Sequence, residues 1–348
     1  MSKRVALVLG SGGARGYAHI GVIDELHARG YEIVGISGSS MGALVGGLQA
    51  AGKLDEYTEW AKSLTQRAVL RLLDPSITAA GVLRVEKILD AVRDILGDVC
   101  IEDLPVPFTA VATDLIAGRS VWLQRGPVDA AIRASIAIPG VITPHVLDGR
   151  LLADGGILDP LPMAPVAAVN ADVTIAVSLG GSESGGRAGP EDADVNPSAD
   201  WLNRLLRSTS ALLDSKSARA VLDTPAVQSM INRFGTVGEE DARSAAETGE
   251  PADGDSSAEQ LVDAAREAAV PKLGSFEVMN RTIDIAQAAL ARHALAAYPP
   301  DLLIEVPRSV SRSLDFHRAA EVVEAGRLVA EEVLDQYEKS GFSPLPAP

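Results

Sequence analysis

The chain has 348 residues, of which 47% are hydrophobic and 4% aromatic, with a formal net charge of −16 and one cysteine, Cys100. The acidic balance argues against nucleic-acid binding, because a protein that holds phosphate backbones needs a basic surface. One cysteine excludes an intrachain disulfide and fits a reducing compartment. No apolar run approaches the roughly 18 residues of a membrane-spanning helix. The apolar run at 5–9 is too short for a signal peptide, so we expect a cytoplasmic protein.

The first motif is a glycine-rich loop, Gly10-Ser11-Gly12-Gly13-Ala14-Arg15-Gly16, between an expected strand at 4–9 and an expected helix at 16–29. Such a loop presents free backbone N–H groups at the start of a helix, where they can bind an anion. The anion can be a phosphate or the oxyanion of an acyl-transfer intermediate. A dinucleotide site is disfavoured, because the spacing is Gly-x-Gly-x-x-x-Gly and Ser37, not an acid, stands at the end of the second expected strand.

The second motif, Gly38-Ser39-Ser40-Met41-Gly42, joins an expected strand at 31–36 to an expected helix at 40–51. A Gly-x-Ser-x-Gly turn holds its serine in a strained backbone conformation, and its glycines avoid collisions with the neighbouring strand and helix. The helix that follows is small or apolar on nearly every face, so we expect it to be buried. Its positive end favours negative charge that develops at Ser40.

Apolar runs and helical patterns alternate as far as residue 180, which predicts an α/β fold with three layers, a mostly parallel central sheet flanked by helices. Further strands are expected at 107–113, 119–124, 151–153 and 172–179, and further helices at 54–66, 85–97 and 127–135. A third motif, Asp154-Gly155-Gly156, follows the short strand at 151–153. It holds an acid at a turn where the backbone can approach its neighbours closely.

The segment 181–271 differs in composition from the rest of the chain. Residues 237–267 alone carry ten acids and two arginines, and high charge with few apolar residues is typical of disorder. We therefore expect a single domain over 1–348 with a partly helical, partly disordered acidic insertion at about 181–271. A lid or membrane-contacting flap and a solvated spacer both remain open for this insertion. A closing strand and helix are expected at about 300–338.

The three motifs together resemble those of the patatin-like phospholipases. The family's glycine loop matches residues 11–16, with Ser11 where relatives often carry glycine. Its serine turn matches residues 38–42, and its Asp-Gly-Gly matches residues 154–156. Several spaced motifs occur in the family's order, and the resemblance covers residues 1–180 and resumes at about 272–338.

This resemblance implies a serine hydrolase that cleaves acyl esters of phospholipids, lysophospholipids or related lipids through an acyl-enzyme. Ser40 would be the nucleophile and Asp154 its base in a Ser–Asp dyad, in a cleft restricted enough to raise the pKa of the acid. The amides of Gly12 and Gly13 would hold the oxyanion. The supporting residues would be Gly10, Arg15, Gly16, Gly38, Gly42, Gly155 and Gly156. No cofactor or metal is implied, and the expected partners are a lipid or acyl-ester substrate and a transiently contacted membrane surface.

Two other functions remain open from the sequence. One is a Ser-His-Asp esterase in which His293 or His317 follows Ser40 and Asp154 in chain order, although no histidine lies in a distinctive motif. The other is a catalytically silent member of the same fold with a regulatory or interaction role. Arg15 likewise has two interpretations, a brace for the glycine loop and a contact to a lipid phosphate.

Overall fold

The computed structural model describes residues 3–72, 86–139, 141–181 and 275–340. The chain divides into two compact units, one formed by residues 1–184 and 279–348 and the other by residues 185–278. The second unit lies almost wholly outside the described residues, and so does the acidic insertion expected at 181–271 apart from its first residue. The sheet and the candidate site belong to the first unit.

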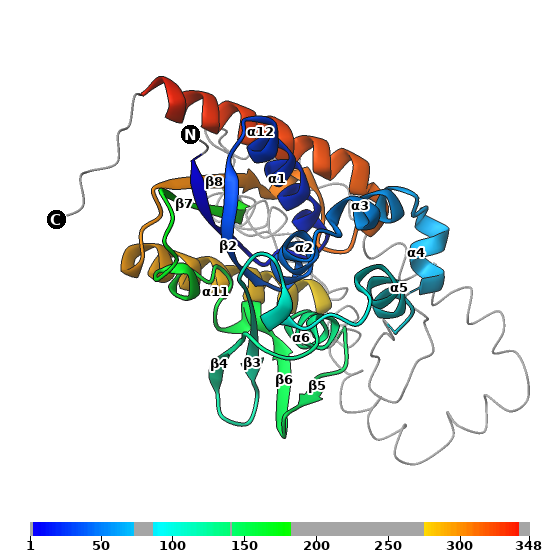
Figure 1. Ribbon diagram of the computed structural model, residues 1–348. Coiled ribbons are helices and arrows are strands. Elements are labelled where there is room, and N and C mark those ends of the chain that lie inside the picture. Colours follow the sequence, from blue (N-terminus) through cyan, green and yellow to red (C-terminus); the bar gives the residue numbers. More distant parts are fainter. Residues whose placement is uncertain (1–2, 73–85, 140, 182–274, 341–348) are drawn as a thin grey trace, which may run out of the picture. The chain divides into compact units, whose positions relative to one another are not determined.

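A mixed sheet of eight strands forms the centre of this unit (Figure 1). Its parallel part has the order β3 (Phe108–Asp114), β2 (Glu32–Ser39), β1 (Arg4–Leu9), β7 (Val173–Gly181) and β8 (Leu302–Pro307). The remaining strands pair antiparallel: β4 (Arg119–Leu123) and β6 (Arg150–Asp154) with β3, and β5 (His145–Leu147) with β6. The predicted α/β fold with a mostly parallel sheet is confirmed.

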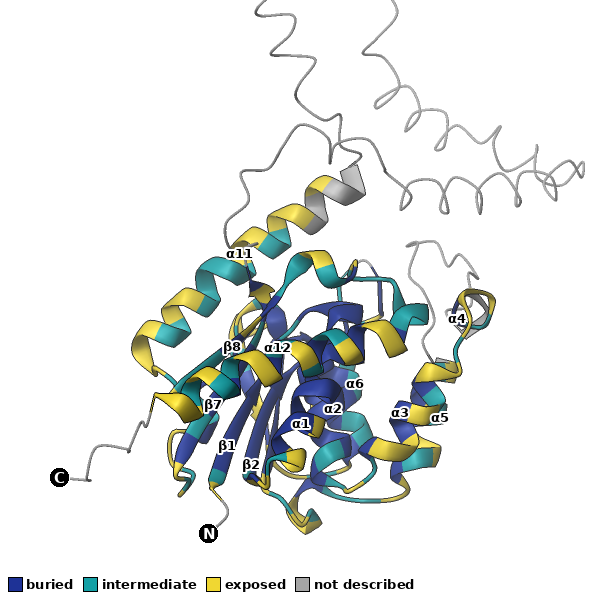
Figure 2. Cartoon of the chain, turned by 90° about the horizontal axis from the view of Figure 1, so that it is seen from above, coloured by how far each residue is buried: buried dark blue, intermediate teal, exposed yellow. Residues whose placement is uncertain are grey.

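Helices cover both faces of the sheet, as the alternation of side chains along β1 shows. Val5, Leu7 and Leu9 belong to a large buried cluster shared with α1 (Ala18–Ala28), α2 (Met41–Ala50) and α12 (Ala319–Lys339). Ala6 and Val8 belong to a smaller cluster on the other face, against which α11 (Ser275–Ala297) packs. Figure 2 shows β1, β2 and α2 buried between these layers, whereas α11 and α12 expose their outer sides.

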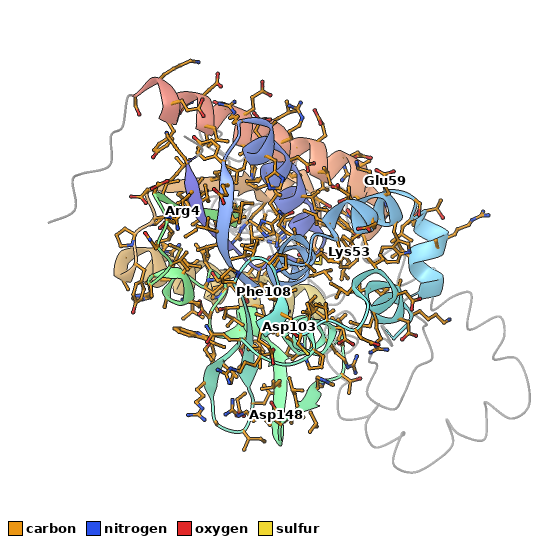
Figure 3. The ribbon with its side chains drawn as sticks, viewed as in Figure 1. Arg4, Lys53, Glu59, Asp103, Phe108 and Asp148 are labelled. Atoms are coloured by element: carbon orange, nitrogen blue, oxygen red, sulfur yellow. The ribbon has the colours of Figure 1, made fainter. Side chains whose placement is uncertain are left out.

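The other described helices are α3 (Leu54–Lys62), α4 (Gln66–Leu72), α5 (Glu86–Leu96) and α6 (Val128–Ser135). Phe108 at the start of β3 is buried, whereas charged side chains such as Glu59, Asp103 and Asp148 lie at the surface (Figure 3). Helix α2 is buried at every residue except Gln49, as its composition predicts.

The structure corrects several predicted boundaries. The expected helix at 16–29 is a 3₁₀ turn, Gly13–Tyr17, followed by α1. Strand β2 extends past Ser37 to Ser39, and the expected helix at 54–66 ends at Lys62. Strand β5 and helices α4 and α11 were not predicted. A strand of three residues and a helix rich in alanine carry little hydrophobic periodicity, so pairing and packing decide their structure.

Helices α1 and α12 cross with their backbones in contact. A Cβ atom on Gly21 would lie 1.9 Å from the carbonyl oxygen of Val323, and one on Gly326 would lie 2.1 Å from that of Ala18. No residue other than glycine fits at either position. Because α1 continues from the glycine loop, this crossing fixes one end of the loop.

We predict that Gly326→Ala lowers the free energy of unfolding by about 2 kcal/mol, because the added methyl group collides with backbone. The loss should occur even though alanine favours a helix over glycine. Chemical denaturation measures it, with Leu328→Ala as the control, since Leu328 on the same helix is 51% exposed. Equal stabilities of Gly326→Ala and the wild type would contradict the described crossing.

Candidate active site

Ser40 occupies the apex of the turn between β2 and α2. Its φ of 56° and ψ of −123° lie in a region that residues other than glycine rarely adopt. The flanking glycines are required by close approach of backbone. A Cβ atom on Gly38 would lie 2.2 Å from the carbonyl oxygen of Gly42, and one on Gly42 would lie 2.1 Å from that of Leu9.

A hydroxyl on a neighbouring helix holds this strained turn in place. Ser135, the last residue of α6, accepts a hydrogen bond from the Ser40 N–H at 2.9 Å and donates one to the carbonyl oxygen of Val111 at 2.6 Å. Ser135 ends the expected helix at 127–135, and no sequence pattern marks this role, because its partners are 95 and 24 residues away in sequence.

Strand β3 brings Ser40 and Asp154 together. Ser39, at the end of β2, pairs with Val111, and Asp154, at the end of β6, pairs with the next residue, Ala112. Because β4 occupies the other edge of β3 along residues 110–114, the ends of β2 and β6 meet on one edge. The Ser40 hydroxyl donates a hydrogen bond of 2.6 Å to Oδ2 of Asp154.

Asp154 lies in a restricted, water-poor environment. It is 4% exposed, and its second carboxylate oxygen accepts a hydrogen bond of 2.8 Å from the Gly156 N–H. Burial raises the pKa of Asp154 from 3.8 to about 6, against the opposing effect of hydrogen bonds from Ser40 and Gly156. A carboxylate with a pKa of about 6 accepts a proton from a hydroxyl more readily than an ordinary aspartate does.

The two glycines after Asp154 leave room for neighbouring segments. A Cβ atom on Gly155 would lie 2.1 Å from the carbonyl oxygen of Val111. One on Gly156 would lie 2.7 Å from Nε2 of Gln287 and 2.8 Å from the Ser11 hydroxyl oxygen. The Asp-Gly-Gly turn is therefore enclosed by β3, the glycine loop and α11.

The glycine loop presents two unused amides. The N–H of Gly10 donates to Val177 at 3.0 Å and that of Ser11 to Pro160 at 2.8 Å, whereas those of Gly12 and Gly13 donate to no partner among the described residues. A Cβ atom on Gly16 would lie 2.3 Å from Cβ of Met41, the residue after Ser40. The loop is thus packed directly against the serine turn.

Arg15 is buried beneath the loop, with 7% exposure. Its Nε donates to the carbonyl oxygen of Gly12 at 3.2 Å, and its Nη2 donates to the Ser313 hydroxyl at 3.2 Å and lies 3.6 Å from a carboxylate oxygen of Asp284. Burial lowers the pKa of Arg15. These contacts support the interpretation that Arg15 braces the loop.

No histidine forms a hydrogen bond with Ser40 or Asp154 among the described residues, which include all five histidines of the chain. His19 is fully buried, with its Nε2 2.8 Å from the carbonyl oxygen of Gly10. Burial lowers the pKa of His19 to about 4. His19 therefore supports the glycine loop as a neutral side chain.

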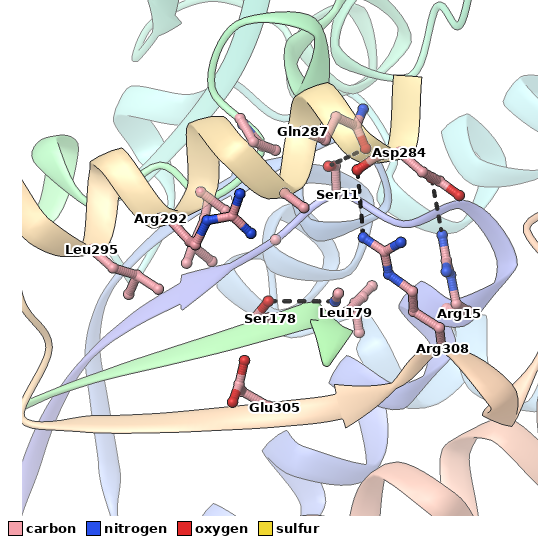
Figure 4. Close-up of a pocket in the computed structure, with 16 residues that line it drawn as sticks. Ser11, Arg15, Ser178, Leu179, Asp284, Gln287, Arg292, Leu295, Glu305 and Arg308 are labelled. Carbon is pink, nitrogen blue, oxygen red and sulfur yellow. Dashed lines mark hydrogen bonds and ion pairs between the residues drawn. The ribbon is translucent and has the colours of Figure 1, made fainter. Parts of the chain in front are cut away.

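A pocket of about 270 Å³ lies between α11, the ends of β7 and β8, and the glycine loop (Figure 4). At one end Asp284 lies between Arg15 and Arg308 (Figure 4). Apolar side chains such as Leu161, Leu179 and Leu295 also line the pocket. Its lining includes neither Ser40 nor Asp154, so it lies beside the glycine loop rather than over the Ser40–Asp154 pair.

In the part of the chain that the structure describes, no cluster of three or more His, Cys, Asp or Glu side chains is arranged to hold a metal ion. Across the same residues, no helix has the length and apolar character needed to cross a membrane.

The raised pKa of Asp154 predicts a pH-dependent cost in stability. An acid whose pKa rises on folding stabilises the protein fully below its unfolded pKa of 3.8, and this contribution is lost as the pH rises through about 6. We expect the stability of the wild type, relative to Asp154→Asn, to fall by on the order of 3 kcal/mol between about pH 4 and pH 7.

Denaturation of both proteins across this range tests the prediction. Burial also raises the pKa of Asp159 to about 6, and its effect cancels in the comparison because both proteins contain it. A stability difference that does not change with pH would contradict the described environment of Asp154.

The family model described as patatin-like phospholipase matches residues 7–167. An uncharacterized NTE family protein of Mycobacterium tuberculosis is 66% identical over 345 residues, which cover 97% of this chain and 93% of that protein. Patatin-like phospholipase domain-containing protein 6 of Homo sapiens is 33% identical over 187 residues, 51% of this chain and 14% of that protein. Neuropathy target esterase sws of Drosophila melanogaster is 32% identical over 186 residues, 51% of this chain and 13% of that protein. The chain therefore belongs to the NTE family, and its resemblance to the patatin-like phospholipases is confirmed over residues 7–167.

Proposed function

We propose that this protein is a serine hydrolase that cleaves acyl esters of phospholipids, lysophospholipids or related lipids through an acyl-enzyme. The patatin-like family and relatives named as esterases and phospholipases support lipid hydrolase activity. The observation that carries the proposal is the 2.6 Å hydrogen bond from the strained, buried Ser40 to the carboxylate of Asp154. A serine hydroxyl is a weak nucleophile until a base removes its proton, and this contact supplies the base.

The proposed reaction has two halves. In the first, Asp154 accepts the Ser40 proton while Oγ attacks the ester carbonyl carbon, and the amides of Gly12 and Gly13 hold the oxyanion. The intermediate collapses as the leaving alcohol takes the proton from Asp154, which leaves an acyl group on Ser40. In the second half, a water gives its proton to Asp154 and attacks the acyl group, and the fatty acid leaves as Ser40 recovers its proton. Loss of one oxyanion donor costs very roughly 10²–10³ in rate.

The geometry favours this dyad over a Ser-His-Asp triad, because Ser40 donates directly to Asp154 with no imidazole between them. Ser40 is 3% exposed and Asp154 4% exposed. The proposed proton transfer between them is therefore shielded from bulk water.

We predict that a fluorophosphonate probe labels the wild type and does not label Ser40→Ala. The probe mimics the tetrahedral intermediate, so labelling needs both an activated serine and a working oxyanion site. Ser39→Ala is the matched control, because Ser39 is the buried neighbour of Ser40 and its hydroxyl has no hydrogen-bond partner in the described structure. Persistent labelling of a folded Ser40→Ala would refute Ser40 as the nucleophile, and an unlabelled wild type would favour a silent family member.

We predict that kcat/KM for a short-chain ester rises with pH and levels off above a midpoint near 6, because Asp154 acts as a base only when ionised. Asp154→Asn should lower kcat by about 10²–10⁴. His293→Ala and His317→Ala should keep the wild-type rate. An active Asp154→Asn together with an inactive histidine variant would support the Ser-His-Asp mechanism instead.

A further inference from the structure

The turn between β3 and β4 presents large apolar side chains to solvent. Ile116 is 81% exposed and Leu115 41% exposed. Asp114 fixes the turn, since its Oδ1 accepts hydrogen bonds from the N–H groups of Ile116 at 3.0 Å and Ala117 at 2.9 Å. Gly118, with a φ of 63°, closes it. Turn positions of this kind usually carry small polar residues, so a rigid turn that exposes an isoleucine needs an explanation.

The β5–β6 hairpin lies beside this turn and has a similar exposed residue. Val146 on β5 is 66% exposed, and Asp148 and Gly149 form the turn with φ values of 49° and 72°. The Leu115 N–H donates to the carbonyl oxygen of Leu151 at 2.9 Å, so the two hairpins are neighbours in one sheet. Figure 1 shows both hairpins projecting together, on the side of the unit away from α12.

Trp122 on β4 extends the exposed apolar surface and is 46% exposed. Trp122 pairs with Val111, and Val146 pairs with Leu151. Val111 and Thr113 lie on one face of β3, and Ala153 and Leu151 lie on one face of β6. Because Thr113 pairs with Ala153, these two faces are the same face of the sheet, so Trp122 and Val146 lie on it together. We call residues 114–119 and 145–150, together with Trp122, the hairpin tips.

Two arginines accompany the apolar residues of the hairpin tips. Arg119 and Arg150 are exposed and lie close enough to Asp114 to lower its pKa, and neither forms a salt bridge among the described residues. The Oδ1 atom of Asp114 already accepts the hydrogen bonds of its turn, and Asp148 is the second acid of the hairpin tips. The tips thus carry no net charge on a chain of −16, and their guanidinium groups are available to pair with phosphates.

The hairpin tips lie at the same edge of the sheet as Ser40 and Asp154. Strand β6 begins at Arg150 in the tips and ends at Asp154. Four residues of extended strand span about 13 Å. A surface that touches the tips therefore comes within reach of the candidate dyad.

We propose that the hairpin tips dock onto the surface of a phospholipid bilayer. Leu115, Ile116 and Val146 enter the boundary between head groups and acyl chains. Trp122, on the same face as Val146 but nearer the dyad, faces the head-group layer, which tryptophan prefers. Arg119 and Arg150 pair with lipid phosphates. The choice of a lipid partner rests on the proposed function, because an enzyme that cleaves membrane lipids must reach them at a surface.

Cosedimentation with vesicles of equal parts phosphatidylcholine and phosphatidylglycerol tests the inference. Every protein carries Ser40→Ala, so that no lipid is consumed. Ile116→Glu should weaken binding at least about tenfold, because the charge cannot enter the apolar layer. Ile116→Ser should also weaken binding. The double variant Arg119→Gln, Arg150→Gln should bind less tightly than Ser40→Ala alone, because it cannot pair with lipid phosphates. Leu328→Glu is the matched control, since Leu328 is 51% exposed on α12, and it should bind as Ser40→Ala alone does.

Two outcomes would overturn the inference. One is vesicle binding of Ile116→Glu equal to that of Leu328→Glu. The other is a lipid-free dimer that Ile116→Glu dissociates without any change in vesicle binding, which would assign the tips to a second copy of the chain. Because binding is scored without hydrolysis, a wild type that cleaves no ester would refute the proposed function and leave this test valid. With Ser40 intact, Ile116→Glu should hydrolyse a soluble short-chain ester at the wild-type rate and a vesicle lipid more slowly.

Discussion

The arrangement of the site depends on one strand, β3, which pairs with β2 and β6 along the same edge. Ser39 pairs with Val111 and Asp154 with Ala112, so two strands from distant parts of the sequence end on consecutive residues of β3. A shift of one residue in either pairing would turn the side chains to the opposite face. The 2.6 Å contact between Ser40 and Asp154 follows from these two registers.

Close packing of backbone around this junction explains the glycines of all three motifs. Gly42 lies against β1, Gly155 against β3, and Gly16 against Met41, in each case too close for a Cβ atom. The same crowding buries Asp154 and raises its pKa to about 6. Burial of Asp154 therefore lowers the stability of the protein at neutral pH, and it also gives the carboxylate the basicity that the proposed reaction needs. Ser135 serves the same end, because it satisfies the backbone of Ser40 in its strained conformation.

The candidate dyad is nearly buried, while the sheet edge beside it exposes Ile116, Val146 and Trp122. For an enzyme that acts on lipids these two features are compatible. A buried dyad excludes water while no substrate is bound, and apolar side chains beside it suit a surface where lipid esters are found. The pocket between α11 and the glycine loop, with Arg15 and Arg308 at one end, is lined by Ser11 and Arg15 of that loop and by neither member of the dyad.

The sequence by itself determined the features that depend on local backbone demands. Alternating apolar runs predicted the parallel strands and buried α2, and the glycines marked each turn where backbone must approach backbone. The positions of Ser40, Asp154 and the amides of Gly12 and Gly13 followed from those turns and from a family resemblance. Only the tertiary structure decided that β6 pairs with β3, that Ser135 holds the serine turn, that Arg15 pairs with Asp284 of α11, and that β5 is a strand. These contacts join residues far apart in the chain, and hydrophobic periodicity carries no information about which distant segment becomes a neighbour.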